Sequence, residues 1–350
     1  MSPPIWEVPA ECQKHNMAVA RMSAGRVSPT LRPNCDLELL EADMPLPGHK
    51  PLTNVGAQPR RSGVRNEAAA LPAANRPSLS YYRPPRRRRD SAEAAILEGF
   101  TAEAAPMEAL PDVAVASFGD ITMLEAVIGN DDRVRVADQL LSANPWRQIC
   151  ALRIKSQTGK MYVGTGWFIA PSALATAGHC VYLQNEGGWA QSIDVIPAKR
   201  GSEEPFGRVT SQRFHAVDGW VNQQQRDFDY GVIRLADATL GGRLGNLEVR
   251  ALSDSALGGV DAKISGYPAD RDRAEFQYFH ERPLMSSTPT RLMYDIDTFG
   301  GQSGSPIWQD TQEGGLVAIG VHTTGGLSSN SGTRINESVL DNFIQWIKDT

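Results

Sequence analysis

Short apolar runs separated by turn residues fill the carboxyl-terminal two thirds of the chain, from about residue 127 onward. The runs are Met161–Ala170, Ile193–Ile196, Gly231–Leu235, Ala262–Gly266, Arg291–Ile296, Pro306–Trp308 and Leu316–His322. Each has the length of a strand, and no repeated helical period lies between them, which is typical of an all-β protein. A helical face forms only at the carboxyl end. Its apolar residues are Val339, Leu340, Phe343, Ile344 and Ile347. The pattern predicts an all-β body closed by a carboxyl-terminal α-helix.

The amino-terminal third has a different texture. Fifteen of the 23 prolines precede residue 126, whereas six of the seven tryptophans follow it. Residues 1–90 show no sustained period, and a segment of this kind buries too little apolar surface to offset the entropy of ordering. We therefore predict a mostly disordered, irregular extension over 1–125 and a folded domain over 126–350. A short amphipathic helix is expected within residues 91–110.

Charge and histidine placement add few candidates for binding. The formal net charge is −5, and the arginine run at residues 83–89 is most simply a solvated basic stretch. Two alternatives are that this run tethers the protein to an anionic surface and that it is a processing site. The four histidines at 15, 49, 215 and 280 are scattered and are expected to be structural or surface residues. We expect no cofactor, metal, nucleic acid or membrane span, and a monomer.

Three short motifs carry candidate chemistry. Ser303 lies in Gly301-Gln302-Ser303-Gly304-Ser305-Pro306, where glycines allow a tight turn that exposes a hydroxyl and backbone N–H groups. His179 lies in Ala177-Gly178-His179-Cys180, and Asp229 precedes Gly231-Val232-Ile233. The gaps of 50 and 74 residues between positions 179, 229 and 303 suit His and Asp on one barrel and Ser on a second. The order His, Asp, Ser is that of chymotrypsin-like proteases.

Residues 126–350 resemble the glutamyl endopeptidases, the bacterial branch of the chymotrypsin-like (trypsin-like) serine proteases that cleaves after Glu and, less well, Asp. The matching segments are 126–133, 176–182, 188–190, 205–207, 229–233, 301–306 and 319–326. The resemblance implies two six-stranded β-barrels and a serine endopeptidase that acts on proteins or peptides. Residues 1–125 match nothing in the family, and their position makes them a candidate propeptide.

The motifs assign the catalytic roles. Ser303 is the expected nucleophile, His179 its base and Asp229 the carboxylate that orients the imidazole. The backbone N–H groups of Gly301 and Ser303 are expected to form the oxyanion hole. Asp227 is the rival carboxylate, but it lies further into a polar loop, whereas Asp229 directly precedes the family pattern.

Specificity rests on the resemblance, which places Thr298 and His322 in the pocket for the P1 residue, the one that precedes the cleaved bond. Asp297 disagrees with that assignment. It lies six positions before Ser303, where trypsin-like enzymes carry the carboxylate that binds Arg or Lys. A preference for basic P1 residues is therefore the alternative. A protease-like binding protein without activity is a second alternative, against which the complete set of three motifs argues.

The resemblance also implies maturation. A cut between Glu125 and Ala126 would create the family-like amino terminus, and a glutamyl protease could make that cut itself, so we expect a zymogen. We predict a disulfide between Cys150 and Cys180, with two buried thiols as the alternative. Cys12 and Cys35 are unassigned. The family is secreted, although no signal peptide is visible at the start of the sequence.

Overall fold

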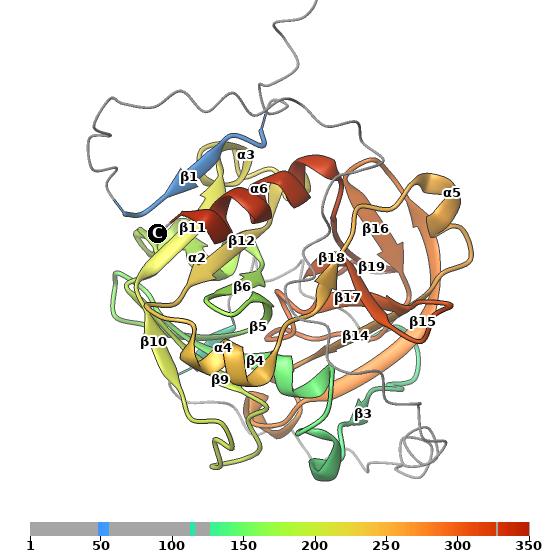
Figure 1. The fold of residues 1–350 in the computed structure, drawn as a ribbon, viewed down its shortest axis with the longest axis horizontal. Helices are drawn as coiled ribbons and strands as arrows, with labels where there is room; N and C mark the ends of the chain where they lie inside the picture. The colour runs from blue at the N-terminus through green and yellow to red at the C-terminus, as the bar shows by residue number, and fades with distance from the viewer. Residues whose placement is uncertain (1–47, 56–112, 116–126, 327, 350) are drawn as a thin grey trace, which may run out of the picture. The chain divides into compact units, whose positions relative to one another are not determined.

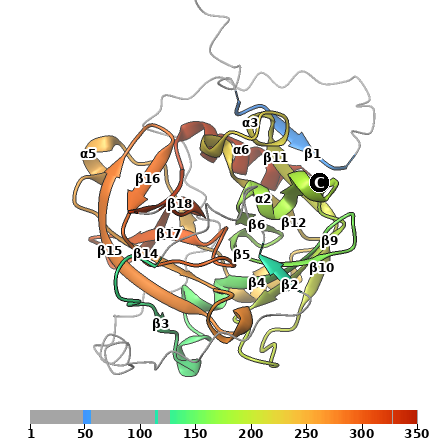
Figure 2. The ribbon, with the colours of Figure 1, turned by 180° about the vertical axis from the view of Figure 1, so that it is seen from behind.

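The computed structural model describes residues 48–55, 113–115, 127–326 and 328–349. Within these ranges two curled β-sheets form most of the regular secondary structure, and Figures 1 and 2 show them on opposite sides of the molecule, with the longest helix on the outside. The expectation of a mostly-β protein with a carboxyl-terminal helix is confirmed. Almost all of the predicted extension lies outside the described residues, including the expected helix at 91–110 and the arginine run.

The first sheet has nine strands among the described residues. In spatial order they are β1 (Pro51–Thr53), β11 (Arg213–Val217), β12 (Gly231–Arg234), β6 (Ala173–Thr176), β5 (Met161–Ala170), β4 (Ile149–Lys155), β9 (Ser192–Pro197) and β10 (Val209–Ser211), and β2 (Val113–Val115) pairs in parallel with β5. All the other neighbours in this sheet are antiparallel. Two of its strands, β1 and β2, come from the region predicted to be an extension.

The second sheet has eight strands among the described residues. They are β3 (Val134–Arg135), β13 (Glu248–Val249), β14 (Asp261–Gly266), β15 (Tyr278–Ser287), β16 (Arg291–Tyr294), β17 (Pro306–Asp310), β18 (Leu316–Thr324) and β19 (Asn330–Arg334). Six of them close a ring in the order β18, β17, β14, β15, β16, β19 and back to β18. This ring is the second of the two predicted barrels.

The prediction of two six-stranded barrels is therefore correct for the second sheet and wrong for the first, which stays open as a curled half-barrel. The physical reason lies at β11. One edge of β11 pairs with β12 and the other with β1, at Pro51↔Val217, Leu52↔Ala216 and Thr53↔His215. β10 ends at Ser211 and β11 begins at Arg213, so the connection between them is too short for these two strands to pair with each other, and the strand order of the sheet ends at β10 and β1.

Helices are few and mostly short. The α-helices are α2 (Gly178–Val181), α3 (Asp218–Val221), α4 (Thr239–Leu244), α5 (Asp254–Leu257) and α6 (Glu337–Lys348). The 3₁₀ turns are η3 (Asp138–Leu140), η4 (Trp146–Gln148), η5 (Gln184–Glu186), η6 (Arg226–Phe228) and η7 (Asp272–Ala274), and a small hairpin joins β7 (Tyr182–Leu183) to β8 (Gly188–Trp189). α6 begins at Asn336, whose side chain accepts a bond from Val339 N–H at 3.0 Å, as an N-cap should.

Packing joins the two sheets. The larger apolar cluster contains residues of both, and an aromatic group of Trp146, Phe279 and Trp308 lies within it, with ring centroids 5.3 to 6.0 Å apart. α6 packs on the first sheet through Phe343 and Trp346, and the Trp346 ring stacks on His215 of β11 at 5.5 Å. The half-barrel and the barrel are thus joined by this larger cluster, and a second cluster of buried apolar residues lies within the second sheet.

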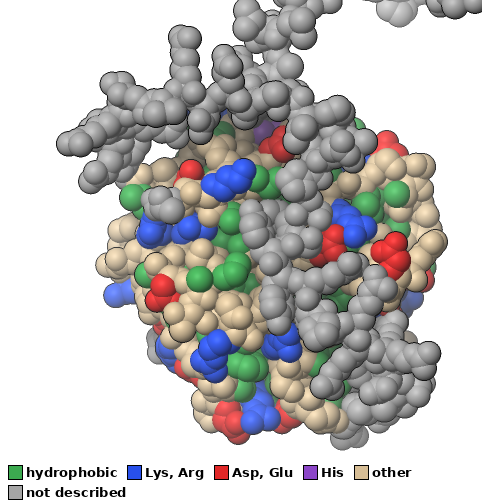
Figure 3. Space-filling view, in the orientation of Figure 1, with side chains coloured by type: hydrophobic (Ala, Val, Ile, Leu, Met, Phe, Trp, Pro, Cys, Tyr) green, Lys and Arg blue, Asp and Glu red, His purple; other side chains and the backbone are tan. Residues whose placement is uncertain are grey.

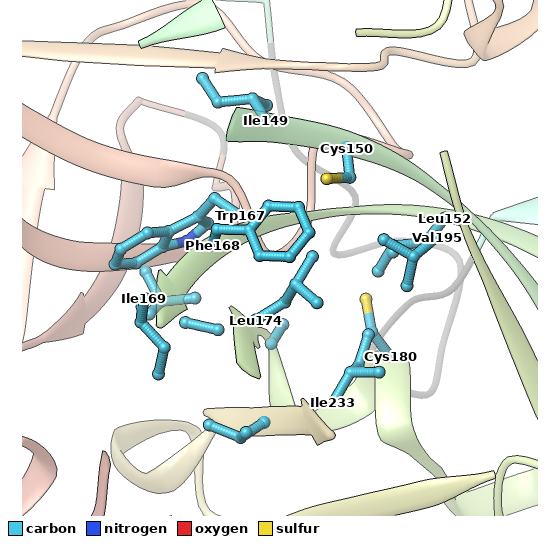
Figure 4. Packing of buried hydrophobic residues seen from close by; sticks show 14 of the residues in the cluster. Ile149, Cys150, Leu152, Trp167, Phe168, Ile169, Leu174, Cys180, Val195 and Ile233 are labelled. Carbon is cyan, nitrogen blue, oxygen red and sulfur yellow. The ribbon is translucent and has the colours of Figure 1, made fainter. Parts of the chain in front are cut away.

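The predicted disulfide between Cys150 and Cys180 is not formed, and the structure has both as buried free thiols. Figure 4 shows the two cysteines within the same packed cluster as Leu152, Val195 and Ile233. Cys150 Sγ contacts Gln148 O at 3.6 Å, and Cys180 Sγ contacts Ser303 O at 3.7 Å. Each thiol is directed to a different carbonyl, and burial raises the pKa of Cys150.

On the face drawn in Figure 3, basic and acidic side chains are interspersed among uncharged ones. Within the part of the chain that the structure describes, none of the helices is both long and apolar enough to span a membrane.

Candidate active site

His179 and Asp229 meet at the junction of two neighbouring strands. His179 lies on α2, directly after β6, and Asp229 lies between η6 and β12. Because β6 and β12 pair antiparallel, with Thr176 opposite Gly231, the end of one strand is adjacent to the start of the other. His179 Nδ1 lies 2.8 Å from Asp229 Oδ2, and the His179 backbone N–H donates to Asp229 Oδ1 at 3.0 Å. The carboxylate thus fixes both the ring and the backbone of the histidine.

The pair is buried, and its electrostatics follow from that. Asp229 is fully buried and His179 is 2% exposed. Burial lowers the pKa of His179, but the Asp229 carboxylate beside it outweighs burial, so the pKa lies above its usual value. Asp227, the rival carboxylate, is half-buried on η6, and the carboxylate bonded to His179 in the described part of the chain is Asp229.

Ser303 lies in a turn that both sheets hold. Its carbonyl accepts from Thr165 N on β5 at 2.9 Å, while the next N–H, of Gly304, donates to His322 O on β18 at 2.7 Å. The same carbonyl also faces Cys180 Sγ, one residue after His179. The turn is therefore positioned against the segment that carries the histidine, and Ser303 itself is 2% exposed.

Glycines are required in this turn. Gly301 has φ +101°, and a Cβ there would lie 2.5 Å from Tyr267 O. Gly304 has φ +89°, and a Cβ there would lie 2.1 Å from Thr165 O and 2.3 Å from Thr176 Oγ1. Side chains rarely adopt this backbone region and would not fit the space. This geometry agrees with the prediction that glycines shape the turn around Ser303.

Thr298 and His322 are both fully buried on the carboxyl-terminal side of the site. His322 lies on β18, and its Nδ1 is 2.6 Å from the Tyr294 hydroxyl. Thr298 Oγ1 is buried without a hydrogen-bond partner among the described residues. A buried hydroxyl is rarely left in this state unless a ligand or water completes it.

The Asp297 carboxylate holds a backbone segment. Oδ1 accepts from Ile128 N at 2.7 Å, and Oδ2 accepts from Asp132 N at 2.9 Å. Its own N–H donates to His280 Nδ1 at 2.9 Å, which makes that ring nitrogen an acceptor, and burial lowers the pKa of His280. Both Asp297 oxygens are thus bound to the segment that follows the predicted maturation site.

Sequence reasoning missed Arg133, which ties that same segment to the serine turn. The fully buried guanidinium pairs with Asp131 at 2.7 Å and with Asp270 at 2.5 Å. Its Nη1 also lies 3.3 Å from Oε1 of Gln302, the residue directly before Ser303. The two carboxylates outweigh burial and raise the pKa of Arg133. An Asp-Asp-Arg run within a family-like amino terminus was the available signal, but the partners Asp270 and Gln302 are 137 and 169 residues away in the chain.

Arg291 was also missed. This mostly buried arginine of β16 bonds Arg226 O at 2.7 Å, Thr323 Oγ1 at 3.2 Å and Thr324 Oγ1 at 2.7 Å. Among the described residues no carboxylate lies within ion-pair distance of it, and burial lowers its pKa. The fold therefore places a desolvated cation against Thr323 and Thr324 of β18, the two residues that follow His322 in the sequence. Nothing in the sequence around Arg291 marks it.

Comparison with known proteins gives concordant results. A profile of the trypsin-like peptidase domain matches residues 164–319. A glutamyl endopeptidase of Bacillus licheniformis is 38% identical over 230 residues, which cover 64% of this chain and 69% of the relative. A Bacillus subtilis protein named extracellular metalloprotease is 33% identical over 252 residues, covering 69% of this chain and 79% of the relative. A solved Glu endopeptidase in complex with MPD superposes with a TM-score of 0.56 at 28% identity, covering 64% of this chain and 100% of that one.

The name of the B. subtilis relative raises the question of a metal site. In the described part of the chain one group of potential ligands comes together, namely Asp132, His280 and Asp297. Both Asp297 oxygens, however, accept backbone N–H bonds, and His280 Nδ1 accepts a third. Catalytic zinc sites need several ligands directed at the ion together with an open position, so these residues do not fit one.

The matched family profile covers the segments that carry His179 and Asp229 as well as the Ser303 turn. The glutamyl endopeptidase relative and the solved structure each extend that likeness to 64% of the chain. The chain belongs to the glutamyl endopeptidase family of the trypsin-like serine peptidases.

Proposed function

We propose that this protein is a serine endopeptidase that cleaves after Glu, or less well after Asp, through an acyl-enzyme formed on Ser303. The observation that carries the proposal is the His179–Asp229 pair at 2.8 Å beside a turn that both sheets pin at Ser303. The family membership supports the same reaction, because its named relatives include glutamyl endopeptidases.

The geometry supports the following sequence of steps. Ser303 Oγ attacks the peptide carbonyl while His179 Nε2 takes its proton, and Asp229 holds the Nδ1 side and stabilises the imidazolium. The N–H groups of Gly301 and Ser303 stabilise the oxyanion, and His179 then protonates the leaving amine. Water attacks the ester in the second half, with His179 again as base. The Asp229 carboxylate favours the charged imidazole at both proton transfers, as the raised pKa of His179 reflects.

Donors suited to an acidic P1 side chain lie near this centre. The Thr298 hydroxyl is buried and lacks a partner in the described part of the chain, and it can donate to a carboxylate. A histidine whose Nδ1 accepts from a tyrosine hydroxyl, as His322 can from Tyr294, carries its proton on Nε2 and is also a donor. We infer that these two groups bind the P1 carboxylate.

Two charges favour acidic over basic P1 residues. Each oxygen of the Asp297 carboxylate already accepts a backbone N–H bond, so this carboxylate is poorly placed to bind an incoming Arg or Lys. The positive charge of Arg291 is held by Thr323 and Thr324, the two residues that follow His322 on β18, and has no ion pair among the described residues. We infer that this charge favours a negative over a positive P1 side chain.

We further propose that the protein is secreted as a zymogen and matured by a cut between Glu125 and Ala126. The bond itself lies outside the described residues. Support comes from the name of the B. subtilis relative, which is called extracellular, and from the anchoring of residues 128–133 by Asp297 and Arg133, directly after the proposed cut.

Labelling with a fluorophosphonate probe tests the nucleophile. The wild-type protein should be labelled at Ser303, as mapped by mass spectrometry, and labelling should be lost in Ser303→Ala and His179→Ala. Ser305→Ala is the matched control, because Ser305 is a fully buried serine two positions along the same turn. Labelling at Ser305, or undiminished peptidase activity in a folded Ser303→Ala protein, would refute the proposal.

A further inference from the structure

Residues 48–54 belong to the predicted propeptide, yet they are built into the catalytic domain. β1 adds an antiparallel strand to β11, and Figures 1 and 2 both show it beside β11 and α3. Hydrogen bonds flank the strand at both ends. At one end, Asp218 N donates to Lys50 O at 2.8 Å. At the other end, Asn54 N donates to Phe214 O at 3.2 Å, and Phe214 N donates to Asn54 Oδ1 at 2.7 Å.

His49 anchors this segment in a pocket of the domain. It is 3% exposed, its Nδ1 lies 2.9 Å from the Tyr230 hydroxyl, and its carbonyl accepts from Asn342 Nδ2 of α6 at 2.8 Å. The ring packs edge-on against Phe228 at a centroid distance of 4.8 Å. Asn342 Nδ2 also donates to the Tyr230 oxygen at 2.7 Å, so the Tyr230 hydroxyl proton is available to donate to His49. The pocket therefore selects a neutral imidazole.

The same contacts reach the residues that flank Asp229. Phe228 and Tyr230, the two contacts of the His49 ring, are the neighbours of Asp229 in the sequence. Gly48 has φ +89°, and a Cβ there would lie 2.3 Å from the Phe228 ring, so the backbone lies directly against it. Gly48 O accepts from Gly219 N of α3 at 3.0 Å, and the next residue of α3, Trp220, has its ring 6.1 Å from that of His179.

We propose that Gly48–Asn54 is a permanent strand of the mature enzyme, retained without a covalent link after the propeptide is cut, and that it positions the Asp229 loop. The proposed effect of this segment on the Asp229 loop rests on the proposed catalytic role of Asp229. Its proposed retention does not, because retention depends only on how the segment binds to Phe228, Tyr230 and Asn342 and to the edge of β11 that pairs with β1.

Retention of the fragment tests the docking. A site for a sequence-specific protease is inserted between residues 55 and 113 of the full Ser303→Ala chain, which cannot cut itself if Ser303 is the nucleophile. After the cut, the amino-terminal fragment should co-elute with the rest in gel filtration at neutral pH. With His49→Ala the fragments should separate, whereas Lys50→Ala, the exposed neighbour that bonds through its backbone oxygen, should leave them together. Separation of the unmutated fragments would overturn the proposal.

A synthetic peptide makes the test independent of how the variants fold. The peptide Gly-His-Lys-Pro-Leu-Thr-Asn-Val, residues 48–55, should displace the bound fragment. The same peptide with Ala at the His49 position should need about tenfold more, the loss expected when a buried hydrogen-bonded group is deleted. Equal potency of the two peptides would show that His49 is not the anchor.

Kinetics test the positioning. In the cut, active enzyme, removal of the fragment should lower kcat by about ten- to a hundredfold with KM nearly unchanged, because the P1 pocket lies on the other sheet and a small displacement of a catalytic group is costly. Adding the wild-type peptide should restore kcat. An unchanged kcat in a form shown to lack the fragment would overturn the positioning role. Absence of activity in every form would instead refute the proposed function, with fragment retention still deciding the docking.

Discussion

The proposed reaction depends on His179, Asp229 and Ser303, which come from three separate segments and are held in place by hydrogen bonds. His179 is fixed through both its ring and its backbone by Asp229, and the Ser303 carbonyl is fixed by Thr165. Such positioning is what converts an ordinary hydroxyl into a nucleophile at neutral pH.

Ser303→Ala should lower peptide hydrolysis by on the order of 10⁶-fold, since a catalytic triad acts as a unit. The side chain is small and its anchoring bonds are made by the backbone, so the fold should persist. Turnover of a peptide substrate, with the thermal unfolding midpoint as control, checks both points. A variant with low turnover and a much lower midpoint would show a structural role instead.

Asp229→Asn should lower kcat/KM by about 10⁴-fold, the size known for this change in the Ser-His-Asp template, and should move its pH profile. The base must be neutral, so kcat/KM rises with pH through the pKa of His179. Asp229 holds that pKa above 6.5 against the effect of burial, so the acid limb of the wild-type profile should lie above pH 6.5. Removal of the carboxylate should shift the limb to lower pH. An unmoved limb would mean that another group controls it.

The motif residues could be found from the sequence because their chemistry depends on local neighbours such as Gly301 and Gly304. Arg133, Arg291 and His49 could not, because what gives them a role is burial beside partners distant in the chain. Asp297 was read as a possible specificity carboxylate from its position alone. Its two backbone partners, Ile128 and Asp132, can be identified only in the folded chain.

At the scale of elements, seven strands were predicted from their apolar runs, whereas β4, β6 and β11 were not among those runs although most of their residues are buried. β5 was expected with its observed bounds, and β9, β12, β14, β16, β17 and β18 were expected within a few residues. β15 was missed because it alternates buried and exposed residues and contains Pro283, and β19 because Asn330–Arg334 has no apolar residue. β1, which extends the first sheet beyond β11, was missed because this three-residue strand lies in a proline-rich region that no periodicity marks.

Displacement of the segment from Ile128 to Arg133 should disturb the serine turn, because Arg133 contacts Gln302 in that turn. Arg133→Gln would leave Asp270 without its buried cation and Asp131 with Arg271 alone, and breaking a buried pair costs about 3–5 kcal/mol. It would also weaken the hold on Gln302 beside Ser303. We expect a lower free energy of unfolding in urea and a reduced kcat.

Arg208→Gln is the matched control for that change, because Arg208 pairs with Glu204 at the surface, where such pairs contribute about 0–1 kcal/mol. Equal losses of stability in the two variants would contradict the role given to Arg133.

At the scale of the whole molecule, the site lies where the two sheets meet. The half-barrel supplies His179 and Asp229, and the serine turn is bonded to β5 of the half-barrel and to β18 of the barrel. Loss of packing between the sheets should therefore abolish activity before either sheet unfolds.

Maturation also belongs to this scale. The purified wild-type chain should cut itself between Glu125 and Ala126, whereas Ser303→Ala and Glu125→Gln should stay intact at that bond, as read by amino-terminal sequencing. Addition of a trace of wild-type enzyme should cut the Ser303→Ala chain but not the Glu125→Gln chain. Cleavage of both variants at this bond without added enzyme would exclude self-processing.

The most direct test of the proposed function is the rate of cleavage of matched peptides that differ only at P1, carrying Glu, Asp, Gln or Arg. Under the proposed assignment of Thr298 and His322 to the P1 carboxylate, kcat/KM should be highest for Glu, lower for Asp, and lower by about a hundredfold or more for Gln, which has the same shape without the charge. Arg should be cleaved least. Preference for Arg over Glu would contradict both the assigned pocket and the structural role of Asp297.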